Sequence, residues 1–140
     1  MIRLIIGLGN PGEKYKNTYH NAGILFSEYA VQHAPEKGLP PTTILTSAVF
    51  MNESGKAVKA ITSRFRLSPE QVFILHDDID IKLGQVKIAQ NRGAAGHHGV
   101  ESVVAALKTK DFIRLRFGIQ PAAGKPTNPE KFVLQPFTEK

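Results

Sequence analysis

The first twelve residues constrain the fold most strongly, because they join a short apolar run to a turn rich in glycine and proline. Residues 1–6 (MIRLII) form a short run that is rich in β-branched isoleucine and is followed by Gly7, which is typical of a buried strand in an α/β sheet. The turn would then lie at the carboxyl end of that strand, where open α/β sheets bind their ligands. The sequence therefore predicts a functional site here, with Asn10 and His20 as nearby candidates.

The letters of the turn, residues 7–12 (GLGNPG), also match the dinucleotide-binding pattern G-x-G-x-x-G. That site needs a helix directly after the turn, whose amides bind pyrophosphate, and an acidic residue about 20 residues further on. Pro11 removes one amide, and no strand with an acidic end follows at that distance. A helix is predicted only from about Asn21, its candidate N-cap. Its apolar face would comprise Ala22, Leu25, Phe26, Tyr29 and Ala30. These features disfavour a nicotinamide cofactor.

Strand-like and helix-like segments alternate along the rest of the chain. After a loop over residues 34–41, the predicted elements are a strand over 42–50, a helix with Ala57, Val58, Ile61 and Phe65 on one face, a central strand over 72–75 that ends in a turn over 76–80, an edge strand over 85–89, a helix with Val100, Val103, Val104 and Leu107 inward, and a strand over 113–119. This alternation predicts an α/β fold: one three-layer α/β/α domain over residues 1–140, with a twisted, mostly parallel mixed sheet.

Composition narrows the functional class. The 140 residues include 18 Lys and Arg against 12 Asp and Glu, which gives a net charge of +6 and favours a polyanionic partner such as nucleic acid. A well-solvated basic surface would give the same charge. The absence of cysteine excludes disulfides and thiolate metal sites. Without a signal peptide or a membrane-length apolar run, we expect a cytoplasmic protein that does not bind membranes.

Several polar side chains follow strands that would end at the same edge of the sheet: Asn10, His20, Asn52, Asp77, His97 and His98. A neutral imidazole can take a proton from water, and a carboxylate on its other nitrogen fixes the tautomer. Asparagine amides can donate to a carbonyl oxygen as it gains charge. No serine lies in a G-x-S-x-G context, so direct attack by water is favoured over an acyl-enzyme.

Several of these residues, and some of their neighbours in the sequence, also have a purely structural interpretation. Asn21 and Asn52 are good helix caps, and His76 beside Asp77 is compatible with a polar surface. Asp77, Asp78 and Asp80 suggest a metal site, but magnesium usually binds carboxylates together with substrate phosphate, and three acids on a turn are more often solvated. Because neighbouring side chains point apart, His97 and His98 are not a spaced zinc motif. We expect no metal and no cofactor.

Six blocks of sequence, taken together and in order, resemble the bacterial peptidyl-tRNA hydrolase family. The blocks are residues 6–12 with Tyr15, Thr18 and 20–23; residues 50–52 with Ser54 and Gly55; residues 76–78 with Asp80; Gly96, His97 and Gly99; residues 114–116 with Gly118 and Ile119; and residues 132–134. The resemblance implies hydrolysis of the ester between a peptide, or an N-blocked amino acid, and the terminal ribose of tRNA. It implies peptidyl-tRNA as the partner, no obligate protein partner and a monomer.

The resemblance also implies roles for individual residues. His20 would be the general base that activates water, and Asp77 would orient it. Asn10 and Asn52 would hold the peptide carbonyl and main chain. The substrate-binding residues would be Tyr15, Phe50, Met51, His97 and His98, with the two aromatic rings near the aminoacyl end and the terminal adenosine. The candidates for tRNA phosphate contacts are Lys87, Arg92 and Arg116.

The sequence departs from the family pattern in four places. His98 replaces an asparagine, and Tyr19 replaces an arginine. The strands that the family normally has between the first helix and residues 50–52 are largely missing, and the sequence ends shortly after Phe137, where the family continues into a C-terminal helix. We expect a smaller sheet, a more open cleft and weaker substrate binding. The alternative function is a non-catalytic tRNA- or RNA-binding relative of the same fold.

Overall fold

The computed structural model of the chain describes residues 2–32, 43–94 and 96–137. Its strands are β1 (Leu4–Gly7), β2 (Thr43–Thr46), β3 (Val72–Lys82), β4 (Val86–Gln90) and β5 (Ile113–Gln120). Its α-helices are α1 (Ala22–Gln32), α2 (Ser54–Arg64), α3 (His98–Leu107) and α4 (Pro129–Phe132), and its 3-10 helices are η1 (Glu13–Tyr15), η2 (Tyr19–Asn21), η3 (Met51–Glu53) and η4 (Pro69–Gln71). The loop predicted over residues 34–41 lies outside the described residues.

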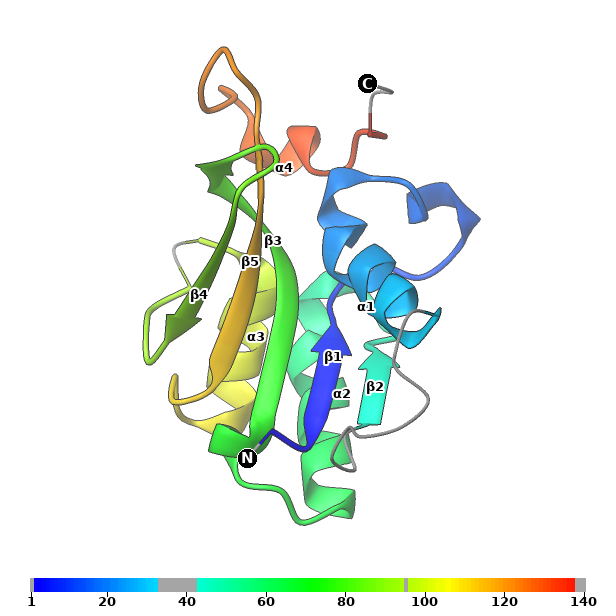
Figure 1. Cartoon of the computed structure of the whole chain (residues 1–140), viewed down its shortest axis with the longest axis vertical. Helices are drawn as coiled ribbons and strands as arrows, with labels where there is room; N and C mark the ends of the chain where they lie inside the picture. Colours follow the sequence, from blue (N-terminus) through cyan, green and yellow to red (C-terminus); the bar gives the residue numbers. More distant parts are fainter. Residues whose placement is uncertain (1, 33–42, 95, 138–140) are drawn as a thin grey trace.

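The five strands form one mixed sheet in the order β2-β1-β3-β5-β4. All pairings are parallel except that of β4 with β5, so the predicted mostly parallel sheet is confirmed, with β3 at its centre and β4 at its edge. Helix α1 covers one face, and α2 and α3 cover the other (Figure 1). The short helix α4 lies beyond the carboxyl ends of the parallel strands, which is the edge where the sequence predicts a site (Figure 1).

The main core lies between the sheet and the two helices behind it. Alternate residues of β1 and β3, including Leu4 and Ile74, are buried against Val58 of α2 and Val100 and Val103 of α3. Successive side chains of a strand point to opposite faces of the sheet, so these alternate apolar residues all point to the face that α2 and α3 cover. The inward residues predicted for α3 are therefore confirmed, with Val104 and Leu107 packed at the border of the core.

Helix α1 contacts the sheet most closely through small residues, and its predicted apolar face is only partly buried. Gly23 and Ser27 are buried, whereas Phe26 and Tyr29 are 37% and 56% exposed. A Cβ atom at Gly23 would lie 2.2 Å from the carbonyl oxygen of Leu75, so the helix and strand backbones are in direct contact there. Because hydrophobic periodicity marks large side chains, it does not reveal a contact made by glycine and serine.

This close approach predicts a large loss of stability for Gly23→Ala. The added methyl group must push α1 away from β3, and we expect the free energy of unfolding to fall by about 3 kcal/mol. Gly93→Ala is the matched control, because a Cβ atom there would meet nothing within 4 Å. Urea denaturation of both variants provides the measurement, and equal stability of the two would contradict the packing described here.

Strand β3 is longer than predicted. The sequence indicated a turn over residues 76–80, but these residues lie within β3, which continues to Lys82. Pairing with β5 extends to Asp78 opposite Gly118 and shifts register before Lys82. A Cβ atom at Gly118 would lie 2.1 Å from the oxygen of Lys82, so glycine permits the irregular pairing. The strand predicted over residues 42–50 is shorter, because β2 ends at Thr46.

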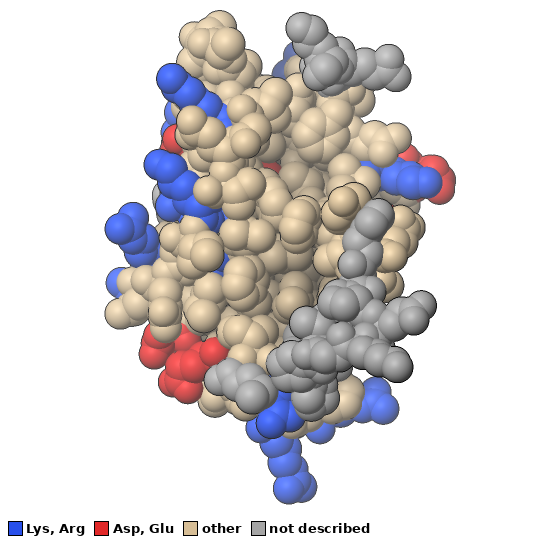
Figure 2. Space-filling model, viewed as in Figure 1, with Lys and Arg blue, Asp and Glu red and all other residues tan. Residues whose placement is uncertain are grey.

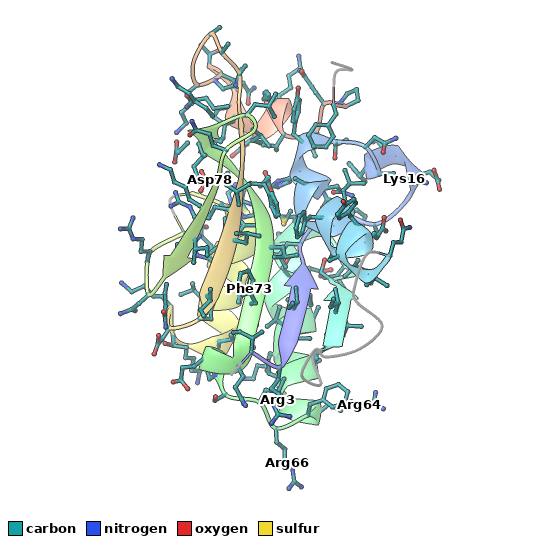
Figure 3. The ribbon with its side chains drawn as sticks, viewed as in Figure 1. Arg3, Lys16, Arg64, Arg66, Phe73 and Asp78 are labelled. Atoms are coloured by element: carbon teal, nitrogen blue, oxygen red, sulfur yellow. The ribbon has the colours of Figure 1, made fainter. Side chains whose placement is uncertain are left out.

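Charge is unevenly distributed over the surface. Lys and Arg side chains gather along the side of the molecule that carries β4, while the face toward the viewer in Figure 2 has few charges. Asp78 lies toward the end of the molecule that carries α4, and Arg3, Arg64 and Arg66 lie at the opposite end (Figure 3). Among the described residues, no helix has the length and apolar character needed to cross a membrane.

Candidate active site

The turn after β1 holds Asn10 in a fixed orientation. The Asn21 side chain accepts a hydrogen bond from the Asn10 backbone N–H at 2.8 Å and donates one to its carbonyl oxygen at 2.9 Å. Asn21 directly precedes α1, as the sequence predicts for its N-cap, but its side chain bonds the Asn10 backbone. The Met51 backbone N–H donates to Asn10 Oδ1 at 2.7 Å. Since Oδ1 is occupied, the amide nitrogen of Asn10 is the group left to contact a ligand.

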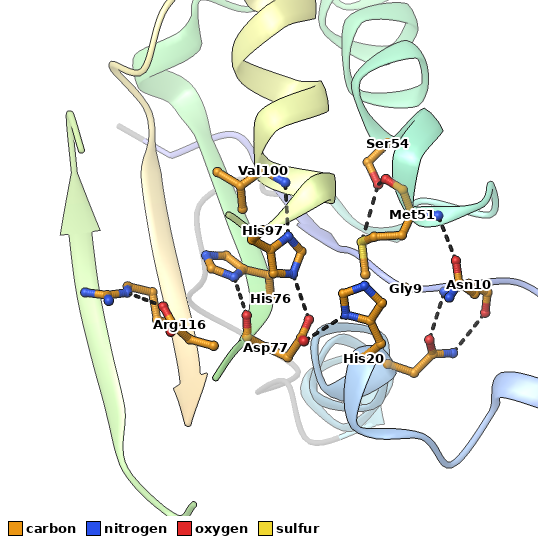
Figure 4. A network of polar contacts seen from close by, with 12 residues as sticks. Gly9, Asn10, His20, Met51, Ser54, His76, Asp77, His97, Val100 and Arg116 are labelled. Atoms are coloured by element: carbon orange, nitrogen blue, oxygen red, sulfur yellow. Dashed lines mark hydrogen bonds and ion pairs between the residues drawn. The ribbon is translucent and has the colours of Figure 1, made fainter. Parts of the chain in front are cut away.

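His20 and Asp77, 57 residues apart in sequence, are in direct contact at the carboxyl edge of the sheet (Figure 4). His20 lies on η2, just before α1, and its Nδ1 is 2.8 Å from Asp77 Oδ2. The side chains are 11% and 2% exposed. Burial alone would raise the pKa of Asp77, but its interactions with His97 and His20 hold that pKa well below its usual range. The carboxylate is therefore ionised at neutral pH.

His97 is the second imidazole on this carboxylate. It is the N-cap residue of α3, and its Nδ1 accepts a hydrogen bond from the Val100 backbone N–H at 3.2 Å. Its Nε2 lies 2.8 Å from Asp77 Oδ1. Both oxygens of Asp77 are thus occupied, one by each histidine (Figure 4).

His76 is buried beside them and does not belong to a polar surface. Its Nδ1 is 2.7 Å from the Asp77 carbonyl oxygen, and Arg114 Nη1 donates to its Nε2 at 3.1 Å. Arg114 also donates to the Gly93 carbonyl oxygen at 3.0 Å. Burial is the largest cause that lowers the pKa of His76 well below its usual value, and the nearby Arg114 guanidinium acts in the same direction. His76 is therefore neutral, with its proton on Nδ1.

Two cavities meet at His20. The α4 pocket has a volume of about 390 Å³ and lies between the ends of β3, α3 and α4, where Glu101 and Glu130 are among its lining residues. The Asn10 pocket has a volume of about 360 Å³. It is lined by Asn10, Tyr15, Phe50, Met51, Asn52 and Leu134, together with His20, His98, Glu130 and Val133, which line both pockets. His20 is thus accessible from both sides.

The Asn10 pocket brings together the predicted aromatic and amide groups. The Tyr15 and Phe50 rings meet edge to face with their centroids 6.2 Å apart, and Phe50 is half exposed. Met51 is buried, and its sulfur occupies the space that a Cβ atom at Gly99 would need. Asn52 is exposed on η3, and Glu53, not Asn52, is the N-cap residue of α2. Asn52 is therefore free to face a ligand.

The two residues at which the sequence departs from the family pattern, His98 and Tyr19, both contact other side chains of the protein. His98 is exposed at the start of α3, with Nε2 3.5 Å from Glu130 and Nδ1 3.7 Å from Glu101. Tyr19 is buried, and its ring packs on Phe132 at 4.5 Å and on Phe137 at 4.7 Å between centroids. The Tyr19 ring thus packs η2 against the segment around α4, and this segment forms one wall of the site.

The three predicted phosphate contacts lie apart from the pockets, on β4, on β5 and in the loop after β4. Lys87 is exposed on β4 opposite Arg116 of β5, and Arg92 follows β4. The Arg116 side chain is only 17% exposed, and its Nε donates to Asp78 Oδ2 at 2.8 Å. Of the three, Lys87 and Arg92 are the more accessible cations.

A metal ion is conceivable at His20, Asp77 and His97, whose ligand atoms lie within 4.8 Å of one another. However, the Val100 N–H occupies the Nδ1 lone pair of His97, so the proton of a neutral ring is on Nε2, the atom that would have to bind the metal. The same atoms already form hydrogen bonds of 2.8 Å. This arrangement favours a hydrogen-bonded group over a metal centre.

Comparison with known proteins supplies the family. A family model described as peptidyl-tRNA hydrolase matches residues 4–140. The chain is 36% identical to the peptidyl-tRNA hydrolase of Sulfurihydrogenibium sp., over 99% of this chain and 80% of that one, and 42% identical to that of Marinobacter nauticus, over 84% and 68%. The crystal structure of peptidyl-tRNA hydrolase from Acinetobacter baumannii superposes with a TM-score of 0.82 at 31% identity, covering 98% of this chain and 77% of that one.

Proposed function

Because this chain belongs to the peptidyl-tRNA hydrolase family and hydrolyses the ester of peptidyl-tRNA, we propose that His20 is the general base of that reaction. The contact between His20 Nδ1 and Asp77 Oδ2, 2.8 Å long, carries the proposal. The carboxylate holds the imidazole proton on Nδ1, so Nε2 has a free lone pair. Nε2 has no hydrogen-bond partner among the described residues, and the ring lines both pockets.

The proposed reaction is a direct attack by water. His20 Nε2 takes a proton while the water oxygen bonds to the ester carbonyl carbon, and Asp77 stabilises the imidazolium that forms. The tetrahedral intermediate then collapses, and the bond to the ribose oxygen breaks. The proton moves from His20 to that oxygen, which releases free tRNA and the peptide with a new carboxylate.

Amide groups in the Asn10 pocket would stabilise and select the acyl part. The Asn10 amide N–H is available as a donor because Met51 holds the amide oxygen, and Asn52 is exposed at the same pocket. One such donor to a developing oxyanion is worth about 3 kcal/mol of barrier. Together the two amides would bind the peptide carbonyl and main chain, which distinguishes a blocked amino acid from a free one.

Aromatic and sulfur-containing side chains would hold the nucleotide end. Tyr15 and Phe50 present faces on which the terminal adenine can stack, and Met51 lines the same pocket. His98 lines both pockets and would donate a hydrogen bond to substrate where the family has an asparagine.

We also propose that residues 1–140 act as a single domain, as a monomer in the cytoplasm.

The direct test uses N-acetylated aminoacyl-tRNA together with the corresponding free aminoacyl-tRNA. We expect the pure protein to release the blocked amino acid with multiple turnovers and to leave the free aminoacyl ester largely intact. Salt-sensitive tRNA binding without ester cleavage would instead identify a non-catalytic RNA-binding relative. Equal cleavage of both esters would contradict the roles of Asn10 and Asn52.

The basic side of the molecule predicts a specific salt effect. If Lys87 contacts a tRNA phosphate, Lys87→Gln should weaken tRNA binding and reduce the slope of log Kd against log salt by about 0.7–0.9. Arg92→Gln should act similarly, and Arg116→Gln less clearly because its partner is Asp78. Arg66→Gln is the matched control, since Arg66 lies at the end of the molecule opposite to α4 and the two pockets (Figure 3). Equal slopes for Lys87→Gln and Arg66→Gln would refute the contact.

A further inference from the structure

Both ring nitrogens of His97 are engaged within the protein. A backbone N–H can only donate, so the contact from Val100 requires an unprotonated Nδ1. The proton of the neutral ring must then be on Nε2, which donates to Asp77 Oδ1 at 2.8 Å. The capping of α3 thus sets the tautomer of His97 (Figure 4).

This tautomer matters because Asp77 has two oxygens and two histidine donors. His20 occupies Oδ2 and His97 occupies Oδ1, and the rings come from different elements, η2 and α3. A carboxylate held at one oxygen can turn about its side-chain bonds, whereas one held at both has a fixed plane. His76, fixed by Arg114, packs at 4.7 Å from the His97 ring and holds the Asp77 carbonyl oxygen.

We propose that His97 is a positioning residue, and the proposal rests on the proposed role of His20. It fixes Asp77 in the orientation that keeps the His20 proton on Nδ1, and it makes no contact with substrate through its ring nitrogens. This assignment differs from the substrate contact that the family resemblance implies for His97. It also links the first turn of α3 to the geometry of the base.

Two substitutions separate the functions of the two nitrogens. The oxygen of asparagine can replace Nδ1, so His97→Asn keeps the cap of α3 and loses the donor to Asp77. The nitrogen of glutamine reaches the place of Nε2, so His97→Gln keeps that donor and loses the cap. We expect His97→Asn to lower kcat by about 10–100-fold with KM unchanged. We expect His97→Gln to recover most of that loss in spite of a lower Tm.

The decisive comparison is that of kcat with Tm in the two variants. A kcat that falls in parallel with Tm, lower in His97→Gln than in His97→Asn, would show a purely structural role and overturn the proposal. A raised KM in both variants would show substrate contact and overturn it as well. In an Asp77→Asn background, adding His97→Asn should cause no further loss of kcat, because both changes remove the same interaction.

A spectroscopic measurement separates this proposal from the proposed function. Nitrogen-15 NMR of the wild-type protein near neutral pH should show His97 as a neutral ring with its proton on Nε2. A cationic ring, or a proton on Nδ1, would overturn the assignment whatever the activity. If the tautomer is as stated but the wild-type protein does not cleave the ester, the proposed function fails while the geometry at Asp77 stands.

Discussion

Asp77→Asn should lower kcat by about 10³–10⁴-fold while the protein stays folded. Two N–H donors, from His20 and His97, point at the carboxylate oxygens. An asparagine offers one acceptor oxygen and one N–H group, so one imidazole must face a donor. If that ring is His20, its proton moves to Nε2, and the base is lost although every side chain remains in place.

The size of the effect is measured by single-turnover hydrolysis of N-acetylated aminoacyl-tRNA, which isolates the chemical step from product release. Asp80→Asn is a matched control on the same strand, because the Asp80 side chain is 39% exposed and pairs with Lys125 at 3.0 Å, away from both histidines. We expect the control to retain nearly all of the rate. A rate for Asp77→Asn within tenfold of wild type would show that the carboxylate does not set the tautomer of the base.

Much of the fold could be predicted from apolar patterning. Continuous apolar runs identified the buried strand β3, and alternation identified the edge strand β4, because each pattern reports how many faces are covered. The face of α1 could not be predicted in this way. Gly23 and Ser27 are buried because two backbones approach closely, and that contact depends on the position of Leu75 in the folded chain.

The site was predictable to the extent that topology determines it. Parallel strands bring their carboxyl ends together, and this rule places Asn10, His20 and Asp77 at one edge. The orienting groups were missed. Asn21 has the sequence signature of a helix cap, and its pairing with the Asn10 backbone appears only in the fold.

Buried polar groups were the hardest to predict. His76 and Arg114 are 1% and 4% exposed, although both residue types usually lie at the surface. They can be buried because they hydrogen-bond to each other and each also hydrogen-bonds to a backbone carbonyl oxygen. The two residues lie on neighbouring strands and are 38 residues apart in sequence. One signal was available: arginine alternates with apolar residues in β5, so Arg114 had to occupy one face of a strand inside the sheet.

The central claim is that His20 Nε2 takes the proton from the attacking water, and His20→Ala tests it most directly. Removing the imidazole leaves Asn10, Asn52 and the aromatic pair in place, so tRNA binding should persist. Only the step that needs a base should be affected, and the single-turnover rate should fall by about 10³–10⁴-fold.

The measurement is the single-turnover rate of ester cleavage in N-acetylated aminoacyl-tRNA by His20→Ala, at protein concentrations that saturate binding. The account predicts release close to the uncatalysed background, with partial recovery when free imidazole is added to occupy the vacated space. Release by His20→Ala at the wild-type rate would contradict it, because the reaction would then proceed without the base.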